Sequence, residues 1–311
     1  YGAELITVPV DDNGVDVEAL EVLIAQHKPK FVYLIPTYGN PSGATLSLER
    51  RKRLLDVAVQ TRTLIVEDDP YGDLYFDEAP PPSLLALSAD VPGSRNWLVH
   101  ASSLSKNLSP GLRIGWMVAP KPLLDKAAMC KQFSDANTSS FAQVTAAIYL
   151  SSGRLGPALQ AMRGIYAKRA HCMCDALQRE MGTAISFVRP LGGLFVWAKL
   201  TGADGAPTDS GALAKRAIEE GVAFVPGAPF FATHPDTTAL RLSFASMDEE
   251  QIEAGVLNLS RFQPLLTHIG VHTSVLAPPN RQHLRTAIEA LLRLLPSRPR
   301  HLRSPQGVSV R

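Results

Sequence analysis

The sequence predicts an α/β fold, in which a mostly parallel sheet is sandwiched by helices and followed by a smaller C-terminal α+β domain. Two patterns carry this prediction. In the first half, near-continuous apolar runs alternate with amphipathic helical patterns, as in parallel sheets that are buried on both faces. After one long helical pattern, short strand-like and helical runs are mixed, which is typical of a compact α+β domain.

The parallel sheet is expected from three strand-like runs, which are KFVYLIPT (30–37), TLIVED (63–68) and NWLVHAS (96–102). The first two enclose SLERRKRLLDVAVQT (47–61), whose apolar residues recur at helical spacing. Two further runs read as strands, AELITVPV (3–10) before them and IGWMVAP (114–120) after them. The first half is therefore predicted to contribute most of one sheet.

The connections and the second half complete the predicted organisation. The proline-rich APPPSLLAL (79–87) reads as a surface crossing, and helices are expected at about 121–133, 140–151, 154–181 and 248–262. We predict a large domain over 1–152, a small domain over 153–262, and an atypical arginine- and proline-rich tail over 263–311.

Composition excludes several classes of protein. Of the 311 residues, 45% are hydrophobic and 19% charged, as in ordinary soluble globular proteins, and the net charge of +2 predicts neither a nucleic-acid nor a membrane partner. The chain has no apolar run long enough to span a bilayer. Its three cysteines, Cys130, Cys172 and Cys174, are too few for a disulfide framework, so we expect reduced thiols, no metal site and a cytoplasmic location.

Polar residues follow the predicted strands where a parallel sheet places its ligand site, beyond the carboxyl ends of the strands. The first run leads into PTYGNPSG with Asn40, and the second into EDDPYGDLYF with Asp68 and Tyr71. Taken singly, Asn40 reads as turn chemistry and Asp68 as a helix cap. The third run leads to Lys106 in HASSLSKNLSPGLRIGW, and a lone loop lysine is usually a solvated surface charge.

Taken together, these residues indicate a cofactor. A lysine amine in a dry pocket has a lowered pKa and can form a Schiff base, while the hydroxyls of Ser103 and Ser105 and the guanidinium of Arg113 suit a phosphate. Pyridoxal 5′-phosphate (PLP) carries both an aldehyde and a phosphate. Its ring nitrogen needs a carboxylate, and its ring hydroxyl needs donors such as Asn or Tyr. Arg241, within the apolar ALRLSFA, needs an anionic partner.

Five motifs in order, NPSG, EDDPY, SLSKNLSPGLRIGW, RPLGGLFVW and LRLSF, resemble the signatures of class I/II, fold-type I PLP-dependent aminotransferases. The resemblance covers residues 1 to about 262 and is greatest to the group of 2-aminoadipate and related broad-specificity aminotransferases. It implies amino transfer from an amino acid to a 2-oxo acid, with 2-oxoglutarate expected, by a ping-pong route through pyridoxamine phosphate.

The resemblance also implies a role for each matched residue. Lys106 would form the Schiff base and move the proton, Asp68 would pair with the ring nitrogen, and Asp69 would point to the opposite side of the chain. Asn40 and Tyr71 would hold the ring hydroxyl, and Arg241, with Asn40 beside it, would bind the substrate carboxylate. The phosphate would be held by Ser103, Ser105 and Arg113.

This chain departs from the family at both ends. The family pattern begins well upstream, with an N-terminal arm, a glycine-rich phosphate-binding turn and an aromatic residue that stacks on the ring. If the chain is the whole molecule, we expect weak or absent cofactor binding, and we expect a homodimer for a full-length protein. Two other functions fit the motifs: the ligand-sensing domain of a transcription regulator, marked by an upstream winged helix, and a PLP-dependent lyase or decarboxylase.

Overall fold

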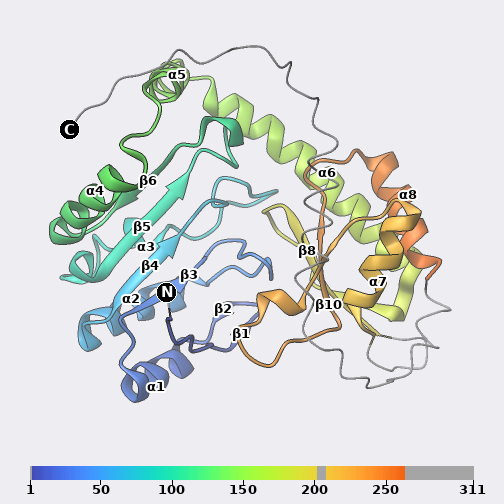
Figure 1. Cartoon of the computed structure of the whole chain (residues 1–311), viewed down its shortest axis with the longest axis horizontal. Helices are drawn as coiled ribbons and strands as arrows, with labels where there is room; N and C mark the ends of the chain where they lie inside the picture. The colour runs from blue at the N-terminus through green and yellow to red at the C-terminus, as the bar shows by residue number, and fades with distance from the viewer. Residues whose placement is uncertain (1, 202–207, 263–311) are drawn as a thin grey trace, which may run out of the picture. The chain divides into compact units, whose positions relative to one another are not determined.

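The fold is taken from a computed structural model that describes residues 2–201 and 208–262, all within one compact unit (Figure 1). The predicted tail at 263–311 lies outside the described residues, and the division at 152/153 stays a prediction. The first half contains β1 (Val10–Asp11), β2 (Gly14–Val15), α1 (Val17–His27), β3 (Phe31–Leu34), α2 (Leu48–Thr61), β4 (Leu64–Asp68), α3 (Leu84–Leu87), η1 (Ser94–Trp97), β5 (Leu98–Ser103), η2 (Pro110–Leu112), β6 (Gly115–Val118), α4 (Lys121–Asp135) and α5 (Ser140–Ser151).

The first half builds the predicted sheet, with strand order β3-β4-β5-β6. β3, β4 and β5 are parallel, with Val66 opposite both Tyr33 and Val99, and β6 runs antiparallel to β5. The three strand-like runs at 30–37, 63–68 and 96–102 are thus confirmed as neighbours. Their carboxyl ends lie at the same edge of the sheet, which is where the predicted site residues follow them.

Helix α2 shows how local sequence fixes one of the covering elements. It begins after Ser47, whose hydroxyl accepts a hydrogen bond from the Arg50 amide, and it ends at Arg62, which adopts a left-handed conformation. Its buried side, which includes Leu54, Leu55 and Ala58, packs into a core with α1, α3 and residues such as Ile65 of the sheet. Burial of this side of α2, at about 1.5–3 kcal/mol for each large side chain, attaches α2 to the sheet.

The β6 edge of the sheet is open on both faces in the part of the chain that the structure describes. Every residue of β6 is exposed, including Trp116, Met117 and Val118, which alternate between the two faces. Helix α4 buries none of its residues, and Phe133 and Phe141 are 83% and 81% exposed. The prediction that 114–120 is a strand is confirmed, but the prediction that it is buried in the core is wrong, because nothing described covers it.

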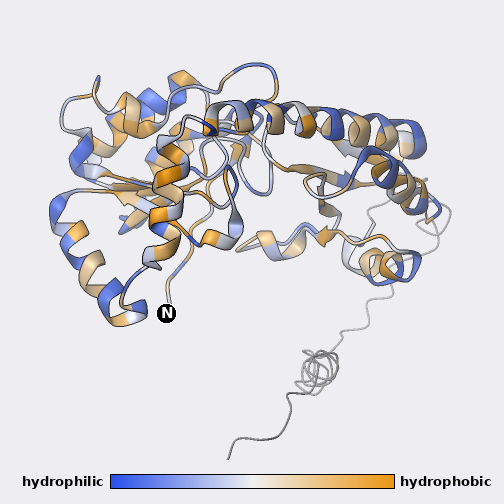
Figure 2. Cartoon of the chain, turned by 90° about the horizontal axis from the view of Figure 1, so that it is seen from above, coloured by the Kyte–Doolittle hydropathy of each residue, from blue (hydrophilic) through white to orange (hydrophobic). Residues whose placement is uncertain are grey.

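The second half folds around an antiparallel sheet of order β7-β8-β10-β9, packed on helices α6, α7 and α8. The long helix α6 alternates hydrophilic and hydrophobic stretches in Figure 2, and its buried side includes Ala170, Cys174 and Leu177. The elements are α6 (Leu155–Met181), η3 (Gly182–Ala184), β7 (Ile185–Phe187), β8 (Phe195–Leu200), α7 (Ser210–Ala217), η4 (Ile218–Glu220), β9 (Val225–Pro226), η5 (Ala228–Phe230), β10 (Ala239–Ser243) and α8 (Glu249–Ser260).

Two local expectations differ from the structure. The strand expected at 3–10 is wrong, since residues 2–9 form no strand and Leu5 is 66% exposed: a strand needs a partner, and only Val10 and Asp11 pair, with β2. The surface crossing at 79–87 ends in the short helix α3, capped by Ser83. Among the described helices, none has both the length and the apolar character needed to cross a membrane.

Candidate active site

The predicted site residues gather at the carboxyl edge of the parallel sheet. Asp68 is the last residue of β4 and Ser103 the last residue of β5, while Asn40 lies in the loop after β3. Asp68 is level with Ala101 across the β4–β5 pair, so Ser103 extends two residues further along the same face. Parallel pairing therefore brings three separate sequence motifs to one edge.

Asp68 and Asp69 diverge at this edge. The Asp68 carboxylate faces β3 and accepts a hydrogen bond from the Tyr33 hydroxyl, 2.6 Å from Oδ2. Asp69 follows the strand: its amide donates to Ala101 O at 2.9 Å, and its carboxylate accepts from the Gly72 amide at 3.1 Å. Burial raises the pKa of Asp69 above its ordinary value. The two carboxylates thus have different partners and surroundings.

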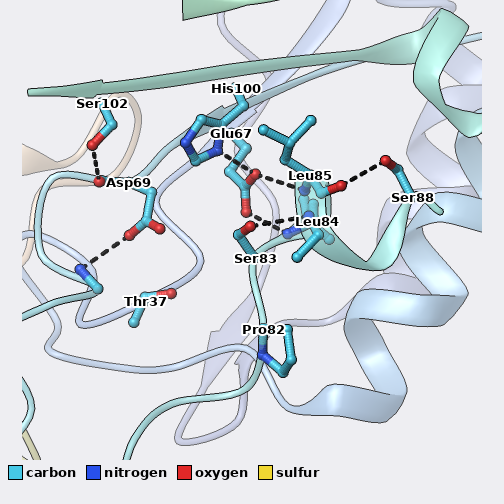
Figure 3. A network of polar contacts seen from close by, with 12 residues as sticks. Thr37, Glu67, Asp69, Pro82, Ser83, Leu84, Leu85, Ser88, His100 and Ser102 are labelled. Carbon is cyan, nitrogen blue, oxygen red and sulfur yellow. Dashed lines mark hydrogen bonds and ion pairs between the residues drawn. The ribbon is translucent and has the colours of Figure 1, made fainter. Parts of the chain in front are cut away.

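A buried network lies behind the strand end that carries Asp68 (Figure 3). Glu67 is fully buried, and its carboxylate accepts hydrogen bonds from the backbone amides of Leu84 and Leu85, at 2.6 and 3.1 Å. Leu84 and Leu85 are the first two residues of α3. His100 Nδ1 lies 2.7 Å from Glu67 Oε2, and this contact raises the pKa of His100. Glu67 thereby ties β4, β5 and the start of α3 together directly beneath the site.

Lys106 lies in the turn at 104–108 that follows β5. The Leu104 carbonyl accepts from the Leu108 and Ser109 amides, and Ser103 Oγ accepts from the Ser105 amide at 2.9 Å, so the turn is well bonded. Lys106 itself is exposed. The expectation of a dry pocket around its amine is therefore wrong for the described residues, because β6 and the adjoining face are uncovered.

Arg113 closes the same hairpin from the other side. Ser103 is opposite Gly115 in the β5–β6 pair, so Arg113 lies beyond the ladder together with Ser105. Its backbone is left-handed, with φ at 54°, and its exposed guanidinium donates to Pro110 O at 3.3 Å. A cavity of about 430 Å³ adjoins it, lined by η2 and the α4–α5 connection. Arg113 and the two serines thus share one end of the site.

Arg241, on β10, contacts the loop after β3. Its Nη1 donates to Asn40 Oδ1 at 2.6 Å, and the guanidinium carbon lies 4.1 Å from the Phe195 ring centre and 5.0 Å from that of Phe230. Its Nε is buried without a hydrogen-bond partner, and burial lowers the pKa of the guanidinium. In residues 2–201 and 208–262 no acidic side chain forms an ion pair with Arg241, so its charge is free to pair with an anion from outside these residues.

Tyr71 lies between these groups. It is 5% exposed, its ring meets Phe195 edge-on at 6.2 Å, and burial raises the pKa of its hydroxyl, so the phenol is protonated at neutral pH. The electrostatic influence of both Asp68 and Arg241 reaches this hydroxyl. The Tyr71 hydroxyl is therefore within electrostatic range of both the carboxylate at the end of β4 and the guanidinium on β10.

Sequence reasoning missed the residues that support the site. Arg51 is fully buried and donates to the carbonyls of Pro36, Leu46 and Pro82 and to the Thr37 hydroxyl, which fixes both ends of the loop with Asn40. In the sequence Arg51 reads as one more charge of ERRKR. For Tyr33 the sequence holds only a weak indication of its contact with Asp68. If the two strands pair in parallel with Tyr33 level with Val66, Tyr33 and Asp68 lie on the same face of the sheet.

The chemistry of these groups fits PLP. The edge offers an amine (Lys106), a carboxylate with a fixed neighbour (Asp68), a protonated phenol (Tyr71) and hydroxyls next to a guanidinium (Ser103, Ser105, Arg113). The buried, unpartnered Nε of Arg241 suits a carboxylate ligand. No group of three or more His, Cys, Asp or Glu residues that could hold a metal occurs in the described part of the chain, and its three cysteines are free.

Comparison with known proteins places the chain in a family. The family "Aminotransferase class I and II" matches residues 1–259. The chain is 41% identical over 262 residues to the 2-aminoadipate transaminase of Thermus thermophilus, covering 84% of this chain and 64% of that protein. It is 34% identical over 196 residues to an uncharacterized HTH-type transcriptional regulator of Bacillus subtilis, covering 63% of this chain and 40% of the regulator.

A solved structure agrees as well. The α-aminoadipate aminotransferase of Thermus thermophilus, in complex with N-(5′-phosphopyridoxyl)-L-leucine, superposes with a TM-score of 0.79 at 38% identity, over 85% of this chain and 66% of that one. The fold is therefore the α/β fold of the type I PLP-dependent aminotransferases. The chain belongs to the class I and II aminotransferase family, and it spans about two thirds of the length of these aminotransferases.

Proposed function

We propose that the protein is a PLP-dependent aminotransferase that moves an amino group from an amino acid to a 2-oxo acid, with 2-oxoglutarate as the acceptor, by a ping-pong route. The observation that carries this proposal is the half-buried Arg241, whose guanidinium lies over the rings of Phe195 and Phe230 and whose Nη1 donates a hydrogen bond to Asn40. A cation in this setting, without an ion-pair partner among the described residues, binds a carboxylate that comes from solution. Every amino-acid and 2-oxo-acid substrate carries one.

The cofactor would be held by groups at the carboxyl edge of the sheet. When bound, PLP supplies an aldehyde that condenses with Lys106 and a ring that accepts electrons. Asp68 would face the ring nitrogen and keep it protonated, and the hydroxyl of Tyr71 and the amide of Asn40 would donate to the ring oxygen. Ser103, Ser105 and Arg113 would bind the phosphate from the β5–β6 hairpin.

The remaining roles are proton transfer and substrate binding, which we assign to Lys106 and Arg241. Lys106 Nζ would take the proton from the substrate α-carbon and return it on the other side of the transferred nitrogen. Arg241 would hold the carboxylate of donor and acceptor in turn, because both carry it at the same distance from the reacting carbon. The two half-reactions would thus use one site.

The exposed apolar residues on β6, α4 and α5 support two further expectations. Trp116, Phe133 and Phe141 are of the kind that a protein interface or another part of a domain covers. We expect that a protein with the full length of its relatives covers this face, shields Lys106 from water and forms a homodimer. A cytoplasmic location stays an expectation.

The test is chemical labelling of the 311-residue chain. PLP is added, the adduct is reduced with borohydride, and the labelled peptide is located by mass spectrometry. We expect the label on Lys106, at low occupancy, and none in Lys106→Ala. Glutamate should form from at least one amino donor with 2-oxoglutarate when a protein with the full length of its relatives is assayed. A label spread over surface lysines, with no change in Lys106→Ala, contradicts the proposed site.

A second function is favoured by the similarity to the Bacillus subtilis regulator, in which this fold would sense a ligand. The labelling test alone does not separate it from the enzyme, since both could hold PLP at Lys106, so glutamate formation decides. Lyase or decarboxylase chemistry is separated in the same assay by the products, because ammonia or carbon dioxide is released only in those reactions.

A further inference from the structure

Tyr33 occupies a position from which it controls Asp68. It lies on β3, level with Val66 of β4, and its side chain is on the same face of the sheet as Val66 and Asp68. The long tyrosine side chain reaches diagonally along this face, and its hydroxyl donates to Asp68 Oδ2 at 2.6 Å. The contact is short and charge-assisted.

The hydroxyl is a permanent donor at neutral pH. Tyr33 is 57% exposed, yet partial burial of its hydroxyl, followed by the hydrogen bond to Asp68 and the charge of Asp68, raises its pKa well above the ordinary value. Within the described residues this is the one hydrogen bond that the structure gives the Asp68 side chain. The hydrogen bond from Tyr33 therefore favours one orientation of the Asp68 carboxylate. It occupies Oδ2 and leaves Oδ1 without a hydrogen bond from the described residues.

We propose that Tyr33 is a positioning residue for Asp68, which it orients so that the free carboxylate oxygen meets the ring nitrogen of the cofactor. This inference rests on the proposed function. A freely rotating carboxylate pays a conformational entropy cost when it pairs with the ring, and a carboxylate fixed by Tyr33 has already lost that freedom. Removal of the hydroxyl should thus weaken PLP binding through Asp68 alone.

The experiment compares Tyr33→Phe with Tyr149→Phe, which removes a hydroxyl from α5 and leaves the Asp68 contact unchanged. PLP affinity is measured by absorbance titration, and urea unfolding checks the fold. We expect PLP to bind about three- to ten-fold more weakly in Tyr33→Phe, as for one lost hydrogen bond to a charged group. Tyr149→Phe should bind as the wild type does.

Two further readouts separate positioning from a general structural role. The visible absorbance of the cofactor bound to Lys106 changes with pH, and its midpoint should move to higher pH in Tyr33→Phe, because a less firmly held ring proton leaves less positive charge near the lysine nitrogen. In an Asp68→Asn background, Tyr33→Phe should have no additional effect on affinity.

Equal affinity and equal midpoints in the wild type and Tyr33→Phe would overturn the inference and leave the proposed function intact. An undiminished effect of Tyr33→Phe in the Asp68→Asn background would also overturn it. A wild-type chain that binds no PLP would instead contradict the proposed function for this chain, and the inference with it.

Discussion

Arg241 Nη1 and Asn40 Oδ1 lie 2.6 Å apart although 201 residues separate them in the sequence. Asn40 belongs to the loop after the first parallel strand, and Arg241 to a strand of the antiparallel sheet. Their hydrogen bond, together with the Phe195 and Phe230 rings on the guanidinium faces, fixes the plane of the arginine. A carboxylate that pairs with this guanidinium would approach along its edge, where the N–H groups point.

Arg241→Lys should damage substrate binding more than the later steps. Lysine retains the charge but loses the planar fork and the stacking on both rings, so we expect KM for donor and acceptor to rise about 10- to 100-fold with a smaller change in kcat. Arg216→Lys is the matched control, since Arg216 stacks on Phe262, 5.5 Å away, outside the site. Equal effects in both variants, or an unchanged KM in Arg241→Lys, would contradict the substrate-binding role.

Arg51→Met should loosen the loop that carries Asn40. The variant leaves three carbonyls and the Thr37 hydroxyl without the buried donor, so we expect a loss of about 2–4 kcal/mol in the free energy of unfolding, measured in urea. Lys52→Met, on the exposed side of the same helix, should change it by less than about 0.5 kcal/mol. If Arg51→Met is as stable as Lys52→Met, the support that we assign to Arg51 is wrong.

The positions of Asp68 and Ser103 could be anticipated because a simple rule governs them. Each follows an apolar run, and parallel strands place such residues at one edge whatever the details of packing. The same holds for helix α2, whose cap at Ser47 and apolar spacing are local features. Local signals and one rule of topology were therefore enough for the three parallel strands, the main helices and the place of these candidate site residues at one edge of the sheet.

Features that depend on the register of strand pairing, or on whether another element packs over a residue, could not be predicted from the sequence. Tyr33 meets Asp68 only because Tyr33 is level with Val66, and apolar patterns do not fix that register. Arg51 can be buried because four oxygen atoms converge on it from the two ends of the loop with Asn40 and from Pro82. Trp116 and Lys106 are exposed because no described part of the chain packs against them. A strand-like run in the sequence does not show whether another element covers the strand.

The Glu67–His100 contact should make stability depend on pH. The hydrogen bond to Glu67 raises the pKa of His100 in the folded state above the unfolded value of about 6.5. The stabilisation is therefore fully present below pH about 6.5 and is lost as the pH rises through the raised folded pKa. The neutral imidazole can still donate to Glu67, so part of the contact survives.

His100→Gln reveals this dependence. We expect it to cost about 1.5–3 kcal/mol of unfolding free energy at pH 6, as for a hydrogen bond to a charged group, and less at pH 9. Urea unfolding of wild type and variant across this range measures the difference. His27→Gln, at the exposed end of α1, is the control and should give only a small difference. A cost in His100→Gln that grows with pH would show that the sign is wrong.

Gly192→Ala should push apart the segment that contains Gly192 and the residues that pack against it, Tyr38 and Leu74. A Cβ at Gly192 would lie 2.5 Å from Tyr38 Cζ and 2.6 Å from the Leu74 carbonyl oxygen, so the loop after β3 or the segment after Tyr71 must move. Overpacking of this kind costs about 1–3 kcal/mol. Because Tyr38 is two residues from Asn40, the shift should also weaken the Asn40–Arg241 contact and raise KM.

The control is Gly164→Ala, on helix α6, where a Cβ meets no atom within 4 Å. There the removal of a helical glycine should stabilise the protein by about 0.5–1 kcal/mol. The two alanine variants are thus expected to change the unfolding free energy in opposite directions, which urea titration of both can measure. A stabilising Gly192→Ala would mean that the loop with Tyr38 yields freely and does not brace Asn40.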